Sequence, residues 1–314
     1  MLPVPTALEG LLGHGQEPGR TIRQPSSALL LVDSADRRQS STLGDNTLTN
    51  LQAINNFTLQ KRQTFLSGYF NRLAVSEIRF PFSTPNVNLR NNKIVVNSIT
   101  VDLDEAYYTP SELAQNLQIA LNADIPGNNF QVTYNEALGT FSITGTSNFT
   151  VAPFVYPNSA QTLKGLYYMM NFGASPLSGT NTYQSNPGPN MQYTAYIDIC
   201  SRALTQYQQV KDNSSRENQS PGLLCRLYLN NFTNENLGDG GTSAKLVWPG
   251  CRPQLIHRAF PQPKFASWSP GQFIDQIDIA LYDDIGQPLY YNDADPNGVY
   301  SHNDFQLTFL ASEN

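Results

Sequence analysis

Hydrophobic and polar positions alternate over short stretches through most of this 314-residue chain. Such alternation predicts strands with one buried face. The pattern predicts strands at residues 28–32, 57–60, 72–82, 93–103, 130–134, 140–144, 193–200, 223–230, 244–248, 254–260 and 305–310, and a hairpin over residues 273–291. The alternation is broken within residues 72–82, which indicates a bulge. Short strands separated by turn signals favour a β-sandwich or jelly roll.

One segment has helical spacing instead. Thr109 as N-cap, Pro110 as the first helical residue and Glu112 as the third form a capping box. The helix should run to about residue 123 and stop before the Pro-Gly pair at residues 126–127. Its apolar positions form one packing stripe: Leu113, Leu117, Ala120 and Leu121. With the hairpin that follows, the helix predicts a strand–helix–hairpin insertion at about residues 104–152, in which no chemistry is visible.

Residues 1–26 have no sustained period and contain several Pro and Gly. We expect an extended N-terminal arm whose Leu8, Leu11 and Leu12 form one amphipathic turn. The arm either orders against a partner or is a free terminus, and the sequence leaves both open. The expected fold class is therefore mainly β: a single jelly-roll β-sandwich over residues 27–314, with the small α+β insertion and the arm.

Composition supports many short strands joined by elaborate loops. The chain has 16 Tyr, 16 Phe, 21 Gly and 21 Pro, with only 14% charged residues. A net charge of −6 argues against nucleic acid as a direct partner, because phosphate binding needs a clustered basic surface. The apolar run at residues 28–32 is too short to span a bilayer, and no secretory signal is visible. We therefore expect no membrane insertion.

Residue types that carry chemistry are few and lack catalytic spacing. The cysteines have no CxxC spacing and are expected to be buried thiols: Cys200, Cys225 and Cys251. The histidines form no zinc-binding pattern: His14, His257 and His302. There is no GxSxG motif. We therefore expect no catalytic residue, no metal site and no cofactor.

Two acidic groups near the C-terminal end allow alternatives. Asp283 and Asp284, and also Asp293 and Asp295 with Asn297, could offer oxygen ligands to calcium. Turns are the favoured interpretation, because no Glu stands at the twelfth loop position and a proline interrupts the pattern. The segment at residues 290–293, Tyr-Tyr-Asn-Asp, would suit stacking on a sugar or equally a surface between subunits.

Several segments, taken in chain order, carry the clearest functional signal. The residues concerned are Asp33, Ser34, Asp36 and Arg37, then an Asn-Phe pair at residues 56–57, then Pro85 and Asn86, and then Tyr108, Thr109, Leu113, Leu117, Leu121 and Asn122. With the closing segment at residues 260–289, this order resembles the penton and related minor capsid proteins of icosahedral double-stranded DNA viruses, including large nucleocytoplasmic viruses and virophages. One departure is the Asp-Glu-Ala-Tyr run at residues 104–107, where relatives often have a Gly, so the turn into the helix should differ.

The resemblance, over about residues 28–310, implies a structural virion protein and no enzyme. It implies a single jelly roll that forms homopentamers at the five-fold vertices of an icosahedral capsid. The partners would be other copies of the chain, the major capsid protein and other minor capsid proteins. The protein would be made in the host cell interior, and Leu8, Leu11 and Leu12 would belong to an assembly arm. The alternatives are a minor capsid (cement) protein away from the vertex or a carbohydrate-binding attachment module; an enzyme ranks last.

Overall fold

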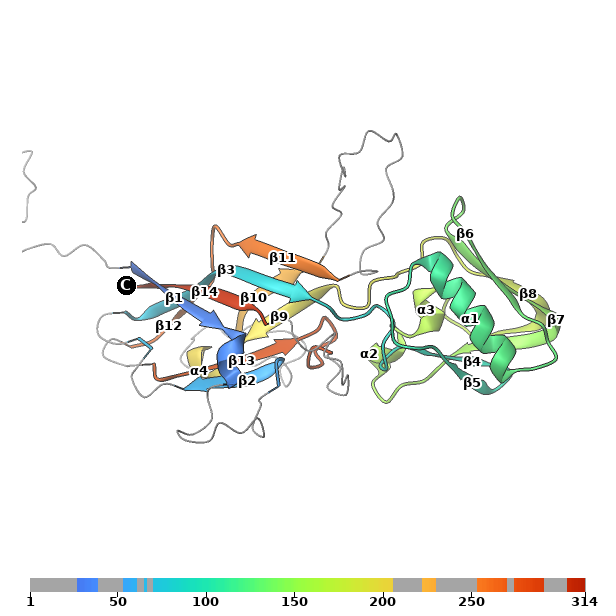
Figure 1. The fold of residues 1–314 in the computed structure, drawn as a ribbon, viewed down its shortest axis with the longest axis horizontal. Coiled ribbons are helices and arrows are strands. Elements are labelled where there is room, and N and C mark those ends of the chain that lie inside the picture. Colours follow the sequence, from blue (N-terminus) through green and yellow to red (C-terminus); the bar gives the residue numbers. More distant parts are fainter. Residues whose placement is uncertain are drawn as a thin grey trace, which may run out of the picture.

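The computed structural model describes residues 27–38, 53–60, 65–66, 70–205, 222–229, 253–269, 274–290 and 304–313. These residues form two lobes side by side along the longest axis of the molecule (Figure 1). We call them the sandwich lobe and the second lobe; the second lobe comprises residues 87–191. The expected arm, with Leu8, Leu11 and Leu12, lies outside the described residues, as does the strand predicted at residues 244–248.

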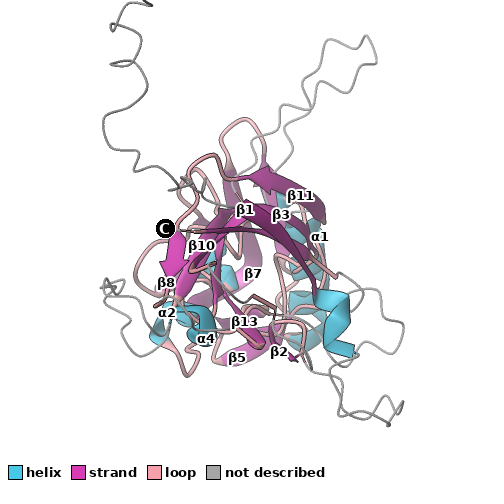
Figure 2. Cartoon of the chain, turned by 90° about the vertical axis from the view of Figure 1, so that its left-hand side faces the viewer, coloured by secondary structure: helices cyan, strands magenta, loops and turns pink. Residues whose placement is uncertain are grey.

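The sandwich lobe consists of two antiparallel sheets. One has the order β1-β14-β3-β11, with β12 also paired to β3, and the other has the order β10-β9-β13-β2. The strands are β1 (Ser27–Asp33), β2 (Asn56–Gln60), β3 (Arg72–Phe82), β9 (Tyr196–Cys200), β10 (Leu223–Tyr228), β11 (Gln254–Ala259), β12 (Phe265–Ser267), β13 (Gln276–Tyr282) and β14 (Gln306–Ser312). Figure 2 shows β1, β3 and β11 facing β13 and β2 across the lobe.

The strand order identifies the architecture. Without β12, the described residues of this lobe form eight strands, which follow each other along the chain as β1, β2, β3, β9, β10, β11, β13 and β14. Numbered one to eight, they give sheets of order 1-8-3-6 and 5-4-7-2. This is the order of a jelly roll, in which consecutive strands alternate between two facing sheets except for the fourth and fifth, β9 and β10, which are neighbours in one sheet. The predicted fold class, a mainly β jelly-roll sandwich, is therefore confirmed.

Aromatic side chains from both sheets fill the core between them. The ring of Phe305, just before β14, packs against two tilted rings. Its centroid lies 5.8 Å from that of Phe57 in β2 and 5.3 Å from that of Phe80 in β3. The predicted bulge in β3 is also confirmed, because Thr308 lies opposite Glu77 and the next residue, Phe309, lies opposite Val75. The extra residue of β3 keeps both flanking stretches in phase with the core.

The second lobe lies in the chain between β3 and β9 and has its own sheet and core. Its sheet has the order β5-β4-β7-β6, with β8 also paired to β7. The elements are β4 (Lys93–Val96), β5 (Ile99–Asp102), α1 (Pro110–Asp124), β6 (Gln131–Asn135), β7 (Thr140–Pro153), α2 (Ser159–Thr162), α3 (Leu166–Met169) and β8 (Leu177–Gln184). The sheet extends on both sides of the expected insertion at residues 104–152, because β7 is long enough to pair with β4, β6 and β8.

Helix α1 has the expected cap. The Thr109 side chain accepts from the backbone N–H of Glu112, and the Glu112 carboxylate accepts from the backbone N–H of Thr109, which is the predicted capping box. Along the helix, Leu113, Leu117 and Leu121 are fully buried, and Ala120 is partly buried against the same core. This stripe packs α1 onto its sheet.

Among the described residues, no helix combines the length and apolar character needed to cross a bilayer.

One strand prediction was wrong, and one predicted hairpin is shorter than expected. Residues 93–103 are a hairpin of β4 and β5, because Asn97 (φ 50°) and Ser98 (φ 64°) adopt the two left-handed conformations of a tight hairpin turn. The hairpin predicted over residues 273–291 is shorter than expected. Within the described residues 274–290, β13 is followed by a turn and an antiparallel bridge between Tyr282 and Pro288, and the Leu289 N–H donates to the Leu281 carbonyl oxygen (2.9 Å).

Candidate functional site

The first motif residues join the start and end of the jelly roll. The Ser34 N–H donates to the Phe305 carbonyl oxygen (2.9 Å), and the Phe305 N–H donates to Ser34 Oγ (2.8 Å). Arg37 is buried, forms an ion pair with Asp304 and donates to the Ser34 carbonyl oxygen (2.7 Å). A buried arginine held by a carboxylate and a carbonyl stabilises a fixed joint. These residues therefore lock η2 (Ser34–Arg38) to the strand that closes the sandwich.

The third and fourth motifs meet each other at the start of the second lobe. The Asn86 side-chain amide donates to the Tyr108 carbonyl oxygen (2.8 Å), and the Tyr108 N–H donates to the Asn86 side-chain oxygen (2.8 Å). Asn91 in turn donates to the Asn86 carbonyl oxygen (2.8 Å). Asn86 is almost fully buried. Its side-chain amide bonds the backbone of Tyr108 as a neighbouring strand would, and so fixes the residue that precedes the N-cap Thr109. These motif residues position α1 and offer no reactive group to solvent.

A polar junction connects the two lobes. Arg90 donates to the Pro288 carbonyl oxygen (2.7 Å) and lies 3.8 Å from the Asp283 carboxylate. Lys164, in the loop after α2, forms an ion pair with Asp284. Two cations of the second lobe, Arg90 and Lys164, thus contact the turn that follows β13. Because these pairs are partly or fully buried, they are only weakly screened by salt.

Asp283 organises this turn from within. Its carboxylate accepts from the backbone N–H groups of Ile285 (3.1 Å) and Gln287 (2.8 Å). Burial raises the pKa of Asp283 to about 6, while the Gln287 N–H, Lys164 and Arg90 act in the opposite direction. Asp283 therefore serves a turn, the interpretation favoured over a calcium loop; Asp293, Asp295 and Asn297 lie outside the described residues.

Tyr290 corrects one expectation. It is 7% exposed, its hydroxyl donates to Glu105 (2.7 Å), and the Arg90 guanidinium lies 5.2 Å from its ring centroid. The idea that Tyr290 stacks on a sugar was wrong, because the junction covers its ring. The remaining residues of that segment, 291–293, lie outside the described part.

The expected cysteine and histidine positions show no reactive cluster where the structure describes them. Cys200 is fully buried, and burial raises the pKa of the Cys225 thiol to about 12. His257 is exposed on β11 beside Glu77. Within the described ranges, no group of three or more His, Cys, Asp or Glu side chains could hold a metal ion. Cys251, His14 and His302 fall outside these ranges.

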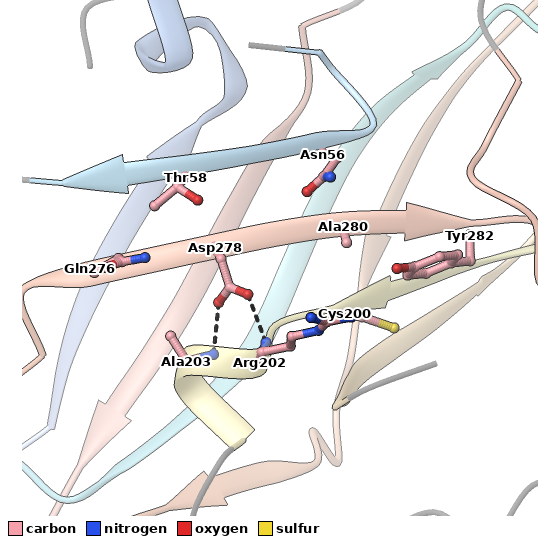
Figure 3. Close-up of a pocket in the computed structure, with 9 residues that line it drawn as sticks. All are labelled: Asn56, Thr58, Cys200, Arg202, Ala203, Gln276, Asp278, Ala280 and Tyr282. Atoms are coloured by element: carbon pink, nitrogen blue, oxygen red, sulfur yellow. Dashed lines mark hydrogen bonds between the residues drawn. The ribbon is translucent and has the colours of Figure 1, made fainter. Parts of the chain in front are cut away.

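A polar hollow of about 540 Å³ lies on the outer face of the β10-β9-β13-β2 sheet. It is lined by Asn56, Thr58, Cys200, Arg202, Ala203, Gln276, Asp278, Ala280 and Tyr282 (Figure 3). The Asp278 carboxylate accepts from the backbone N–H groups of Arg202 and Ala203 (2.9 Å each), at the start of α4 (Arg202–Thr205). The sequence does not mark this site, because its lining comes from three strands and a helical turn that are distant along the chain. The available signal is the run of outward positions in β13, which alternate with the buried Ile277, Ile279 and Leu281.

The chain is similar to known proteins at the level of solved structures. No protein-family model matches the chain. No curated protein matches it either. Among solved structures, the chain is similar to the selenomethionine-labelled mavirus penton protein, at 12% sequence identity and a TM-score of 0.49, over 93% of this chain and 100% of that one.

Proposed function

We propose that this chain is a structural capsid protein of the penton type, which forms pentamers at the five-fold vertices of an icosahedral shell. The observation that carries the proposal is the use of the motif residues. These residues carry the resemblance to penton proteins. Arg37 connects the start and the end of the jelly roll, and Asn86 and Thr109 hold helix α1 in the second lobe, which lies between the third and fourth strands of the jelly roll. Residues that stabilise the fold in this way are expected in a protein with a structural role.

The edge of the jelly roll supports an assembly role. In the described part of the chain, β1 pairs with β14 alone, so its other side is a sheet edge. On its outer face Leu29 is 71% and Leu31 is 62% exposed. An exposed apolar edge strand is a liability in a monomer, and natural proteins usually cover or charge such an edge. We propose that a neighbouring copy covers it in a closed, head-to-tail ring.

The other partners follow from the same proposal. The major capsid protein and other minor capsid proteins would surround the ring, and the protein would be located in the virion. The arm at residues 1–26 would reach under adjacent subunits through Leu8, Leu11 and Leu12. We propose no direct contact with nucleic acid, in keeping with the net charge of −6.

The test is the solution mass of the purified protein and of an edge variant. Five copies of the 34.8 kDa chain weigh about 174 kDa, which light scattering distinguishes from the monomer. The double variant Leu29→Asp with Leu31→Asp should remain monomeric, because each buried leucine contributes about 1.5–3 kcal/mol and a buried charge opposes association. Its melting temperature should stay close to that of the wild-type monomer.

Leu138→Asp is the matched control, because Leu138 is also exposed (57%) but lies between β6 and β7 in the second lobe. This variant should assemble like the wild type. If both variants assemble normally, β1 is not the contact. A wild-type protein that stays monomeric at every concentration would move the proposal toward a minor capsid position or an attachment module.

A further inference from the structure

The hollow on the outer face of the sandwich exists because small side chains occupy one row of the sheet. Ala280 of β13 lies opposite Asn56 of β2 on one side and Cys200 of β9 on the other. In the neighbouring rows lie Tyr282, opposite Asp198, and Asp278, opposite Thr58. The short Ala280 side chain, beside the fully buried Cys200, therefore lies lower than its neighbours Asp278 and Tyr282 on the same strand.

The walls carry polar groups. The lining includes the side chains of Asn56, Gln276 and Arg202 and the ring of Tyr282. Asn56, Gln276 and Arg202 are exposed to solvent, and Tyr282 is half-buried. These side chains together provide amide, hydroxyl and guanidinium groups over one concave surface.

Among the described residues that line the hollow, Arg202 is the cation and Asp278 is the carboxylate. Asp278 is occupied by the Ser201 hydroxyl (2.6 Å) and by the two N–H groups of α4. Next to the hollow, Arg226 and Asp198 pair through two hydrogen bonds (2.6 and 2.9 Å). Arg202 extends from the start of α4 toward Cys200, on the side where Tyr282 lies (Figure 3). An anion is therefore favoured at the Tyr282 side of the hollow, away from Asp278.

We propose that this hollow binds a sugar ring that carries a carboxylate, such as a sialic or uronic acid. The carboxylate would lie between the Arg202 guanidinium and the Tyr282 hydroxyl, because planar guanidinium groups bind carboxylates with strong, charge-assisted hydrogen bonds. The ring hydroxyls would bind Asn56, Thr58 and Gln276. The volume of about 540 Å³ falls within the range of small-molecule sites and leaves room for more than a lone carboxylate.

Saturation-transfer NMR and calorimetry on the full chain test this proposal. The probes are N-acetylneuraminic acid and glucuronic acid, with glucose as the neutral comparison, each titrated through the millimolar range. The two acids distinguish a sialylated glycan from a uronate-containing polysaccharide as the source. We expect at least one acid to bind and glucose to bind at least tenfold more weakly. Added salt should lower the affinity for the acid.

Variants connect the binding to this hollow. Arg202→Gln should weaken binding of the acid about tenfold or more, because it removes a charge-assisted hydrogen bond. Ala280→Phe should abolish binding by filling the hollow while keeping the charge. Arg258→Gln is the matched control, an exposed arginine on β11 in the opposite sheet. Melting curves establish that each variant is folded.

Three results would overturn the proposal. They are no binding of either acid, equal binding of glucose and the acids, or binding that survives both Arg202→Gln and Ala280→Phe. None of these results depends on the oligomeric state, so the capsid proposal and the sugar site fail or succeed separately.

Discussion

The Asn86 amide occupies the place that a neighbouring strand would have beside Tyr108. It pairs with both the N–H and the carbonyl oxygen of that residue, 22 positions away. Asn86→Ala would leave two buried backbone groups of Tyr108 without a partner, so we expect a loss of about 2–4 kcal/mol in the free energy of unfolding. Urea denaturation measures this loss.

Asn148→Ala is the control for that measurement. Asn148 is exposed, and the hydrogen bond from its side-chain amide to the Gly179 carbonyl oxygen is long at 3.3 Å. Its replacement should change the free energy of unfolding by less than about 0.5 kcal/mol. Equal losses in the two variants would contradict a structural role specific to Asn86.

Asp283 gives the lobe junction a predictable response to pH. Its pKa is raised from 3.8 to about 6 in the folded protein, so the folded state binds this proton more tightly than the unfolded chain does. Its contribution to stability is therefore greatest below pH 4 and is lost as the pH rises through 6. Asp283→Asn removes the titration while the side-chain oxygen can still accept from the Ile285 and Gln287 N–H groups.

The measurement is the free energy of unfolding of both proteins from pH 4 to pH 7. We expect the Asn variant to gain about 2–3 kcal/mol relative to the wild type over this range. A difference that is constant across the range would contradict the raised pKa of Asp283.

At the scale of single elements, helix α1 depends on its buried stripe. Leu117 is fully buried in the core of the second lobe, so Leu117→Asp would bury an unpaired carboxylate. We expect a loss of more than about 4 kcal/mol, with a lower melting temperature and a weaker helical circular-dichroism signal. Ile119→Asp, two residues away but 60% exposed, should change the free energy of unfolding by less than about 0.5 kcal/mol. An unchanged melting temperature in Leu117→Asp would contradict the packing of the stripe.

The elements that were predicted correctly are those whose signals are local. The capping box at Thr109 and Glu112 needs only four consecutive residues, and the alternation of Phe305, Leu307 and Phe309 needs only five. The hairpin at β4 and β5 was missed because Asn97 and Ser98 interrupt a run of β-branched residues without glycine. Residues with a positive φ other than glycine give a weaker turn signal.

The parts that could not be predicted depend on contacts between distant segments. The junction joins Arg90, Lys164 and Asp283, whose separations no periodicity encodes. The hollow likewise combines outward residues of β2, β9 and β13 whose register only the folded sheet defines. The motif residues are visible in the sequence. The structure adds that Arg37 and Asn86 are buried and that each connects two segments distant along the chain.

At the scale of the whole molecule, the two lobes differ in the surface that they offer for assembly. The sandwich lobe presents the exposed leucines of β1, and the second lobe has its own closed core. A head-to-tail contact closes into a ring only when the rotation between neighbours divides a full turn. The number of copies in that ring is the central quantity of the proposed function.

The most direct measurement is the symmetry of the assembled particle in averaged electron micrographs of the largest peak from gel filtration. We predict rings with five-fold symmetry, built from copies of the intact 34.8 kDa chain. Rings of any other symmetry, or only single two-lobed particles at every concentration, would contradict a pentameric vertex protein.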